Sequence, residues 1–229
     1  MGCTYEDKSD QYFSGVNLAV TRLLPESSSA RVLDVGCGDG SLGRTLKEAG
    51  KAHFVAGVEL HGRAASKASG VLDAVHVSDI ERWEAPPEYV SSFDFVIFAD
   101  VLEHLLDPHA VLKRCAALLS DDGVVIASIP NVRWAPVVWE LAIRGNWRYE
   151  AAGVLDETHL RFFTKRTMRE MFETCGSEIE AWYPQFYCSL SRPFRIPLRV
   201  LAMALGTFEE LTSIQYLIKA QLPRTVDDG

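Results

Sequence analysis

Short apolar stretches alternate with amphipathic ones along the first 130 residues of the chain. The apolar stretches hold four to seven residues and are rich in Val, Ile and Phe, which is typical of strands buried on both faces of a sheet. Helical spacing follows several of them, and two predicted helices have clear ends, because 41–49 is followed by Gly50 and 108–119 begins with Pro108. The predicted strands are 31–36, 53–59, 74–77, 93–99 and 124–129.

This alternation predicts an α/β fold with a mostly parallel sheet and helices on both of its faces. Ligands of such sheets bind beyond the carboxyl ends of the strands. The pattern becomes irregular after residue 130, and 229 residues suit one large domain. We therefore predict a single domain over 1–229, with an insertion at about 131–164 and a helical segment at about 192–211. Within and after the insertion we predict a helix inside 131–145, no regular period at 146–164, a helix at 165–175, a strand at 177–183 and a last strand at 213–222.

Charge and cysteine usage narrow the class of protein. The net charge of -8 and the pI of about 5.3 argue against a nucleic-acid partner. The five cysteines are odd in number and none has the C-x-x-C spacing, so neither a disulfide framework nor a zinc site is indicated. The first residues lack the apolar core of a signal peptide, and we expect a cytoplasmic protein with no membrane-spanning segment.

The most informative segment is VLDVGCGDG at 32–40, in which a strand runs directly into three alternating glycines and then a helix. Glycines at such a turn let the backbone bend sharply and let a ligand lie against main-chain N–H groups. Acidic residues follow at successive strand ends: Glu59 about twenty residues on, then Asp79, then Asp100. A carboxylate in the position of Glu59 can accept both hydroxyl groups of a ribose.

A literal G-x-G-x-x-G at 38–43 would indicate a dinucleotide site, but its register is wrong. The first glycine of that fingerprint follows the strand directly, which here is Gly36, and the third position is then Ser41. The acids around the loop would also repel a pyrophosphate. They suit a ligand with a ribose and a positive charge, such as S-adenosylmethionine, and a dehydrogenase is the disfavoured alternative.

VLDVGCGDG, Glu59, Asp79 with Ile80, and FDFVIFADVLEHLLDP at 93–108 resemble the successive motifs of class I S-adenosylmethionine-dependent methyltransferases. The resemblance covers about 10–180 and implies a Rossmann-like sheet of seven strands whose last strand, 213–222, is antiparallel. It implies S-adenosylmethionine as cofactor. The residues it places around the cofactor are Asp34, Gly36, Cys37 and Gly38 at the methionine part, Glu59 at the ribose, Leu60, Asp79 and Ile80 at the adenine, and Ala99 and Asp100 near the sulfonium.

A narrower resemblance covers about 128–175. SIPNVRW, GNW-x-Y and GVLDETHLRFFT are similar to segments of bacterial methyltransferases of glycan and O-antigen biosynthesis. It implies polysaccharide biosynthesis and a saccharide or other small-molecule acceptor. Two alternatives stay open: an O- or N-methyltransferase of a small secondary metabolite, and a cofactor-binding accessory subunit with little turnover, as in accessory proteins of methionine biosynthesis.

Methyl transfer to a hydroxyl oxygen needs a group that takes the proton, and histidine suits that role near neutral pH. His104 follows the fourth strand, and His159 lies near Asp156, whose carboxylate is close enough in sequence to orient an imidazole. We predict His104, His159 and Asp156 as the catalytic residues, and we assign no metal ligands, although Glu103 beside His104 is a conceivable pair.

Two further features keep two interpretations each. The aromatic residues of the insertion either form a lid that stacks on sugar rings or make its own small core. The arginines at 192, 195 and 199 flank an apolar stretch that would either touch a membrane surface or pack as a helix or dimer face. The aromatic residues are Trp134, Trp139, Trp147, Tyr149, Phe162 and Phe163.

Overall fold

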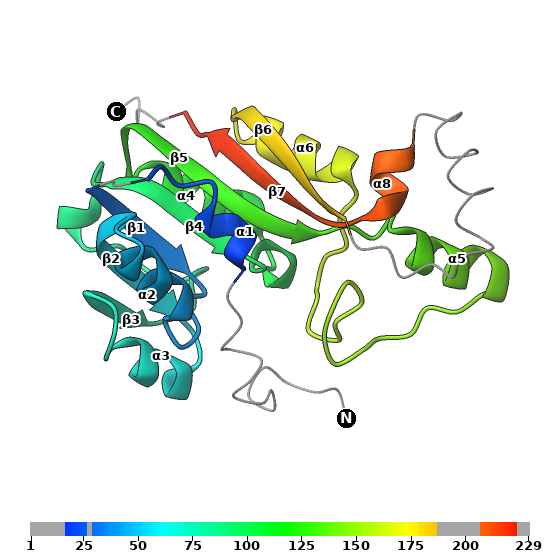
Figure 1. Cartoon of the computed structure of the whole chain (residues 1–229), viewed down its shortest axis with the longest axis horizontal. Coiled ribbons are helices and arrows are strands. Elements are labelled where there is room, and N and C mark those ends of the chain that lie inside the picture. The colour runs from blue at the N-terminus through cyan, green and yellow to red at the C-terminus, as the bar shows by residue number, and fades with distance from the viewer. Residues whose placement is uncertain (1–16, 27–28, 187–206, 224–229) are drawn as a thin grey trace.

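The computed structural model describes residues 17–26, 29–186 and 207–223. Seven strands form one sheet in the order β3-β2-β1-β4-β5-β7-β6 (Figure 1). The first five strands pair in parallel, whereas β7 is antiparallel to both of its neighbours, so the sheet is mixed. The strands are β1 (Ala30–Val35), β2 (Ala52–Glu59), β3 (Ala74–Val77), β4 (Phe93–Ala99), β5 (Leu119–Pro130), β6 (Glu178–Phe186) and β7 (Ser213–Gln221).

The predicted seven strands with an antiparallel last strand are confirmed. The parallel strands β1, β2, β4 and β5 are largely buried on both faces, which explains their apolar runs, whereas the edge strand β3 is only half-buried. β1, for instance, buries Val32 and Leu33 on opposite faces. The register of β1 pairs Asp34 with Gly57 of β2, and β7 pairs Leu217 with Ser128 of β5.

Helices cover both faces of the sheet and create two separate cores (Figure 1). One core lies against α1 (Leu18–Thr21), α2 (Ser41–Glu48) and α3 (Gly62–Ala68). The other includes buried residues of α4 (Pro108–Ala116) and α6 (Lys165–Thr174), such as Leu112 and Phe172. The remaining helices are α5 (Ala135–Arg144), α8 (Phe208–Thr212) and the short 3-10 turns η3 (Pro87–Tyr89) and η4 (Leu102–His104).

Several elements differ from the sequence-based expectation, most clearly at β5, α4 and α3. β5 starts at Leu119, five residues before the predicted residue 124. The polar residues 120–123 are part of the strand, because β5 already pairs with β4 at Leu119 and continues past a register shift between Phe93 and Phe95. α4 accordingly ends at Ala116. The helix α3 was missed, since its alanines, serine and lysine form too short an apolar face to stand out. Most of the predicted helix at 192–211 lies outside the described residues, and its described end contains α8.

The segment predicted as an insertion, 131–164, leaves the sheet after β5. α5 extends away from the sheet, and the chain returns from it in a long irregular loop to the start of α6 (Figure 1). This loop agrees with the lack of period at 146–164. Within the described ranges, no helix is both long enough and apolar enough to cross a membrane.

Candidate functional site

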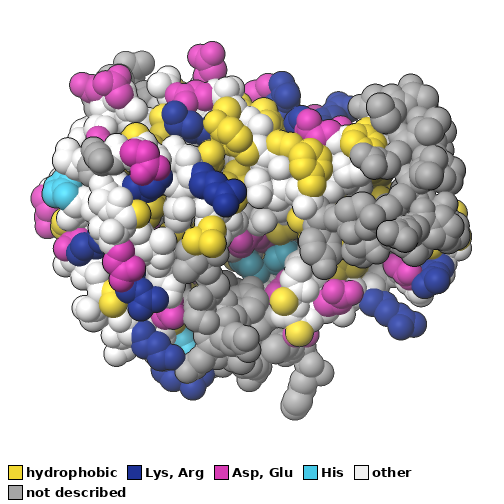
Figure 2. Space-filling model, viewed as in Figure 1, with side chains coloured by type: hydrophobic (Ala, Val, Ile, Leu, Met, Phe, Trp, Pro, Cys, Tyr) yellow, Lys and Arg dark blue, Asp and Glu magenta, His cyan; other side chains and the backbone are white. Residues whose placement is uncertain are grey.

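A cleft of about 960 Å³ lies beyond the carboxyl ends of the parallel strands. Figure 2 shows the hollow near the middle of this face, with acidic and histidine side chains visible at its floor. All thirteen residues singled out from the sequence line this one cleft: Asp34, Gly36, Cys37, Gly38, Glu59, Leu60, Asp79, Ile80, Ala99, Asp100, His104, Asp156 and His159. They come from four strand ends and from the loop of the insertion, so the fold gathers residues that are up to 125 positions apart (159 minus 34).

The glycine loop between β1 and α2 needs a left-handed backbone at three positions. Gly36, Gly38 and Gly40 have φ values of 70°, 55° and 81°. At Gly36 a Cβ atom would also lie 2.6 Å from Cγ2 of Val101, which lines the same cleft. The main chain of Gly36 therefore forms part of the cleft wall, and Gly40 serves as the residue before α2 rather than as a dinucleotide glycine.

Glu59 ends β2 and is 4% exposed. Its carboxylate accepts backbone N–H groups from Gly38 (2.8 Å, Oε2) and His61 (2.7 Å, Oε1). Each carboxylate oxygen has a further lone pair, so Glu59 can hold the glycine loop and still accept ligand hydroxyl groups.

Asp34 lies inside β1 and is 1% exposed, and its Oδ2 accepts no hydrogen bond from the described residues. Burial, together with the negative charge of Glu59, raises the pKa of Asp34 to about 7. A buried carboxylate without a partner is costly, and a cationic group in the cleft would offset that cost. Burial also raises the pKa of the neighbouring Cys37 thiol, so this thiol is neutral. Its Sγ packs against Gly57, where an added Cβ would lie only 2.5 Å from the sulfur.

Asp79 and Leu60 line the cleft on the side of β2 and β3. The Asp79 carboxylate accepts the N–H of Glu81 at 2.9 Å, which fixes the turn after β3. Ile80 is buried, and its carbonyl accepts from the Arg114 guanidinium at 2.6 Å. Leu60 is 57% exposed, so an apolar side chain faces the open cleft there.

Asp100 is held in an unusual backbone conformation at the end of β4, with φ of 58°. Its carboxylate accepts from the Ser128 hydroxyl at 3.2 Å and from the Gln215 amide. Asn17 donates in turn to the Ser128 hydroxyl at 3.1 Å. The protein around the Asp100 carboxylate keeps water away from it, which raises its pKa to about 6. The hydrogen bonds of Ser128, Gln215 and Asn17 limit this increase. Ser128, Gln215 and Asn17 were missed, because nothing in their local sequence points to a residue about 30 to 110 positions away.

The two predicted histidines lie next to each other, with ring centroids 4.7 Å apart. His104 belongs to η4 and His159 to the loop of the insertion, which is anchored by two N–H groups, of Leu160 and Arg161, on the carbonyl of Glu103 (2.9 and 3.0 Å). His104 Nδ1 lies 3.1 Å from the carbonyl oxygen of Thr158, and His159 Nδ1 lies 3.1 Å from that of Val154.

The carboxylate nearest to the His159 imidazole is that of Glu103, whereas the sequence predicted Asp156. Its Oε1 lies 3.8 Å from Nε2 of His159. Asp156, 1% exposed, accepts the N–H and the hydroxyl of Thr158 at 2.8 and 2.6 Å and so holds the residue that contacts His104. Glu103, His104 and His159 together offer one carboxylate and two imidazoles, a set that could bind a metal ion.

Among the aromatic residues of the insertion, Trp147 and Tyr149 pack on Phe162, whereas Phe163 joins the core of the sheet and Trp139 is 46% exposed. Phe162 makes edge contacts with Trp147 (5.1 Å) and His159 (6.1 Å between centroids), and Phe163 is buried. Among the described residues that line the cleft, none is one of these aromatics, so the structure favours a small core of the insertion over a stacking lid. The three arginines of the apolar stretch near 192–199 lie outside the described residues.

Comparison with known proteins agrees with this architecture. Residues 10–181 match the family model described as a methyltransferase domain. The chain is 36% identical over 111 residues to a protein of Neisseria meningitidis named ubiquinone biosynthesis O-methyltransferase, covering 44% of each chain. It is 37% identical over 131 residues to the protein of that name from Xanthomonas euvesicatoria, covering 55% of this chain and 52% of the relative. The chain thus spans about half the length of the curated relatives it matches.

Solved structures share the fold at low sequence identity. A SAM-dependent methyltransferase from Archaeoglobus fulgidus superimposes with a TM-score of 0.61 at 21% identity, over 94% of this chain and 96% of the other.

Proposed function

The chain belongs to the methyltransferase domain family, with S-adenosylmethionine as its cofactor, and from this premise we propose that it methylates a hydroxyl oxygen of a saccharide or other small-molecule acceptor. The observation that carries the proposal is a single cleft lined both by the acids and glycines of β1 to β4 and by two adjacent histidines. The acids and glycines suit binding of the cofactor, and the two histidines suit removal of the proton from an acceptor hydroxyl.

The residues of the cleft fit the cofactor chemically. When bound, S-adenosylmethionine supplies a methyl group on a positively charged sulfur, and this sulfur leaves as a neutral thioether. The orphaned oxygen of Asp34 suits an ammonium group, and Gly36 presents its main chain to the cleft at a position where a side chain would collide with Val101. We assign Asp34, Gly36, Cys37 and Gly38 to the methionine part, Glu59 to the ribose, Leu60, Asp79 and Ile80 to the adenine, and Ala99 and Asp100 to the surroundings of the sulfur.

His104 and His159 are the proposed acceptors of the hydroxyl proton. Backbone carbonyls only accept hydrogen bonds, so Nδ1 of each imidazole carries a hydrogen toward its carbonyl and Nε2 carries the lone pair. Nε2 of either ring is the atom that takes the proton of a hydroxyl placed in the cleft. Asp156 acts as a positioning residue through Thr158.

The relatives favour oxygen as the methylated atom and suggest a second acceptor class. Both proteins cited above bear the name ubiquinone biosynthesis O-methyltransferase. A phenolic acceptor is therefore the alternative to the saccharide that the segments at 128–175 indicate.

Transfer of a radiolabelled methyl group tests the proposal. Purified protein is incubated with labelled S-adenosylmethionine and two panels, one of nucleotide-linked and lipid-linked sugars and one of catechols and phenols. Label in a sugar supports the saccharide acceptor. If label is found in phenols and in no sugar, the phenolic acceptor replaces the saccharide. Cofactor binding without label in either panel contradicts the proposed activity and favours an accessory subunit.

Replacing Glu59 with alanine is expected to weaken cofactor binding by about 1–3 kcal/mol, because two ribose hydroxyl groups lose a charged acceptor and the Gly38 N–H loses its partner. Calorimetric titration with S-adenosylmethionine measures this, with Glu48→Ala on the exposed side of α2 as control. Unchanged affinity of the Glu59 variant would remove Glu59 from the ribose site.

Replacing Asp34 with asparagine is expected to change the pH dependence of stability and to weaken the cofactor. The folded-state pKa of about 7 exceeds the ordinary value of 3.8, so the wild type loses stability as the pH rises from about 4 to 7. The variant lacks this loss. Its free energy of unfolding, relative to that of the wild type, should therefore be about 1–3 kcal/mol higher at pH 8 than at pH 4.5. Urea unfolding at both pH values measures the difference. At pH 8 cofactor affinity should fall about 10- to 100-fold, since the ammonium loses its carboxylate; parallel stability profiles or retained affinity would contradict the assignment.

A further inference from the structure

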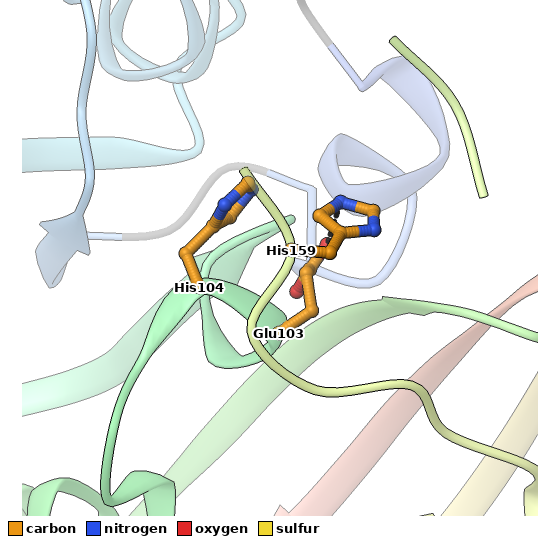
Figure 3. A group of neighbouring side chains, drawn as sticks. All are labelled: Glu103, His104 and His159. Carbon is orange, nitrogen blue, oxygen red and sulfur yellow. Dashed lines mark ion pairs between the residues drawn. The ribbon is translucent and has the colours of Figure 1, made fainter. Parts of the chain in front are cut away.

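Three side chains of kinds that bind metal ions meet in the cleft, where η4 contacts the loop at 146–164. One donor atom from each of Glu103, His104 and His159 lies within 4.8 Å of the other two. Figure 3 shows the two imidazoles side by side, with the Glu103 carboxylate beneath His159. Two of these residues come from η4 and the third from the insertion loop some 55 positions later (159 minus 104), so the group exists only because the loop docks on η4.

Glu103 is the unusual member of the group. It is 1% exposed, and neither of its carboxylate oxygens accepts a hydrogen bond from the residues that the structure describes. Its backbone, by contrast, is well used, because its carbonyl accepts the N–H groups of Leu160 and Arg161. A buried carboxylate is normally hydrogen-bonded, paired or bound to a metal.

Both histidines are prepared as metal ligands by their surroundings. Metal-binding imidazoles usually donate one ring N–H to a carbonyl or carboxylate, which directs the lone pair of the other nitrogen at the ion. His159 meets this condition through Val154 and His104 through Thr158. The hydroxyl of Thr158 donates to Asp156, so it presents a lone pair to His104 Nδ1 at 3.3 Å and favours the same tautomer.

We propose that Glu103, His104 and His159 bind one divalent transition-metal ion on the wall of the cleft. Two imidazoles and one carboxylate suit Zn²⁺, Mn²⁺, Fe²⁺ or Co²⁺ better than Ca²⁺ or Mg²⁺. Ligands around such an ion lie about 2.0–2.2 Å from it, so binding draws the three donors closer together by side-chain rotation. All three residues also line the cleft, which leaves the remaining coordination positions to solvent or to a ligand.

The consequence for the reaction rests on the proposed function. An ion in this place would contact the acceptor hydroxyl and lower its pKa, so that the hydroxyl proton would pass to solvent in the open cleft, and the two imidazoles would act as ligands instead of proton acceptors. The binding site itself does not depend on that role, and the assignment departs from the sequence-based expectation of no metal.

The test measures metal binding by the full-length protein without cofactor or acceptor. The chelator-treated protein is dialysed against Zn²⁺ or Mn²⁺ and the bound metal is counted, while Co²⁺ provides a visible absorption spectrum that reports its ligands. We expect one ion per chain and at least a 100-fold weaker affinity in Glu103→Gln and in His159→Asn. His53→Gln removes an exposed histidine at the other end of β2 and should bind as the wild type does.

Glu103→Gln keeps the size of the side chain and removes a buried charge, so it is expected to fold, which circular dichroism verifies. Absence of bound metal in the wild type, or equal binding by the wild type and Glu103→Gln, would overturn the site. Methyl transfer measured in parallel separates the two proposals. Metal bound without methyl transfer refutes the proposed function and leaves the site intact, whereas methyl transfer at an unchanged rate by metal-free protein overturns the role of the ion in the reaction and leaves the proposed function intact.

Discussion

Replacing Gly36 with valine is expected to abolish measurable binding of S-adenosylmethionine, which corresponds to a loss of at least about 3 kcal/mol. Gly36 has φ of 70°, which a β-branched residue adopts only under strain. Its added Cβ would also lie 2.6 Å from Cγ2 of Val101, and the remaining side-chain atoms would extend into the cleft that the main chain now lines. Isothermal titration calorimetry of the folded variant measures the loss.

Gly50 offers a matched control for the strain alone. It has φ of 67°, close to that of Gly36, but a Cβ there would meet no atom within 4 Å, and it lies past α2 and away from the cleft. Gly50→Val should lose stability and keep its affinity for the cofactor. Equal affinities of the two variants would show that Gly36 does not form part of the cofactor site.

The glycine loop and the strand-end acids could be predicted from the sequence because their signal is local. A buried strand, a glycine that follows it at once and a helix after it determine where Gly36 must lie. The parallel order of the strands then brings Glu59, Asp79 and Asp100 to one edge. Each of these residues lies at or just after the end of a strand that its own local sequence predicts.

The polar partners of the site could not be predicted in the same way. Gln215 reaches Asp100 only because β7 inserts antiparallel beside β5, and no local pattern announces that pairing. Glu103 meets His159 because the insertion loop docks its backbone on η4, whereas sequence distance favoured Asp156. In the sequence only the adjacent pair Glu103 and His104 signals this group, and that pair does not identify His159 as its third member.

Replacing His159 with alanine is expected to lower kcat by about 10²- to 10⁴-fold while the affinity for S-adenosylmethionine changes little. His159 lies at the wall of the cleft formed by η4 and the insertion loop, whereas the residues assigned to the cofactor follow β1 to β4. Both roles considered for it, proton acceptor and metal ligand, act on the acceptor oxygen, so both predict a loss in turnover instead of cofactor binding. Single-turnover and steady-state methyl transfer, together with calorimetry, measure the two effects separately.

His109 supplies the control for this last substitution. It is an exposed histidine of α4, 44% exposed in its side chain, and His109→Ala should leave both kcat and cofactor affinity near their wild-type values. Weaker cofactor binding with unchanged turnover in His159→Ala would move His159 to the cofactor site. If neither quantity changes, His159 only supports the loop, and the role in turnover passes to His104, whose imidazole lies against the same ring.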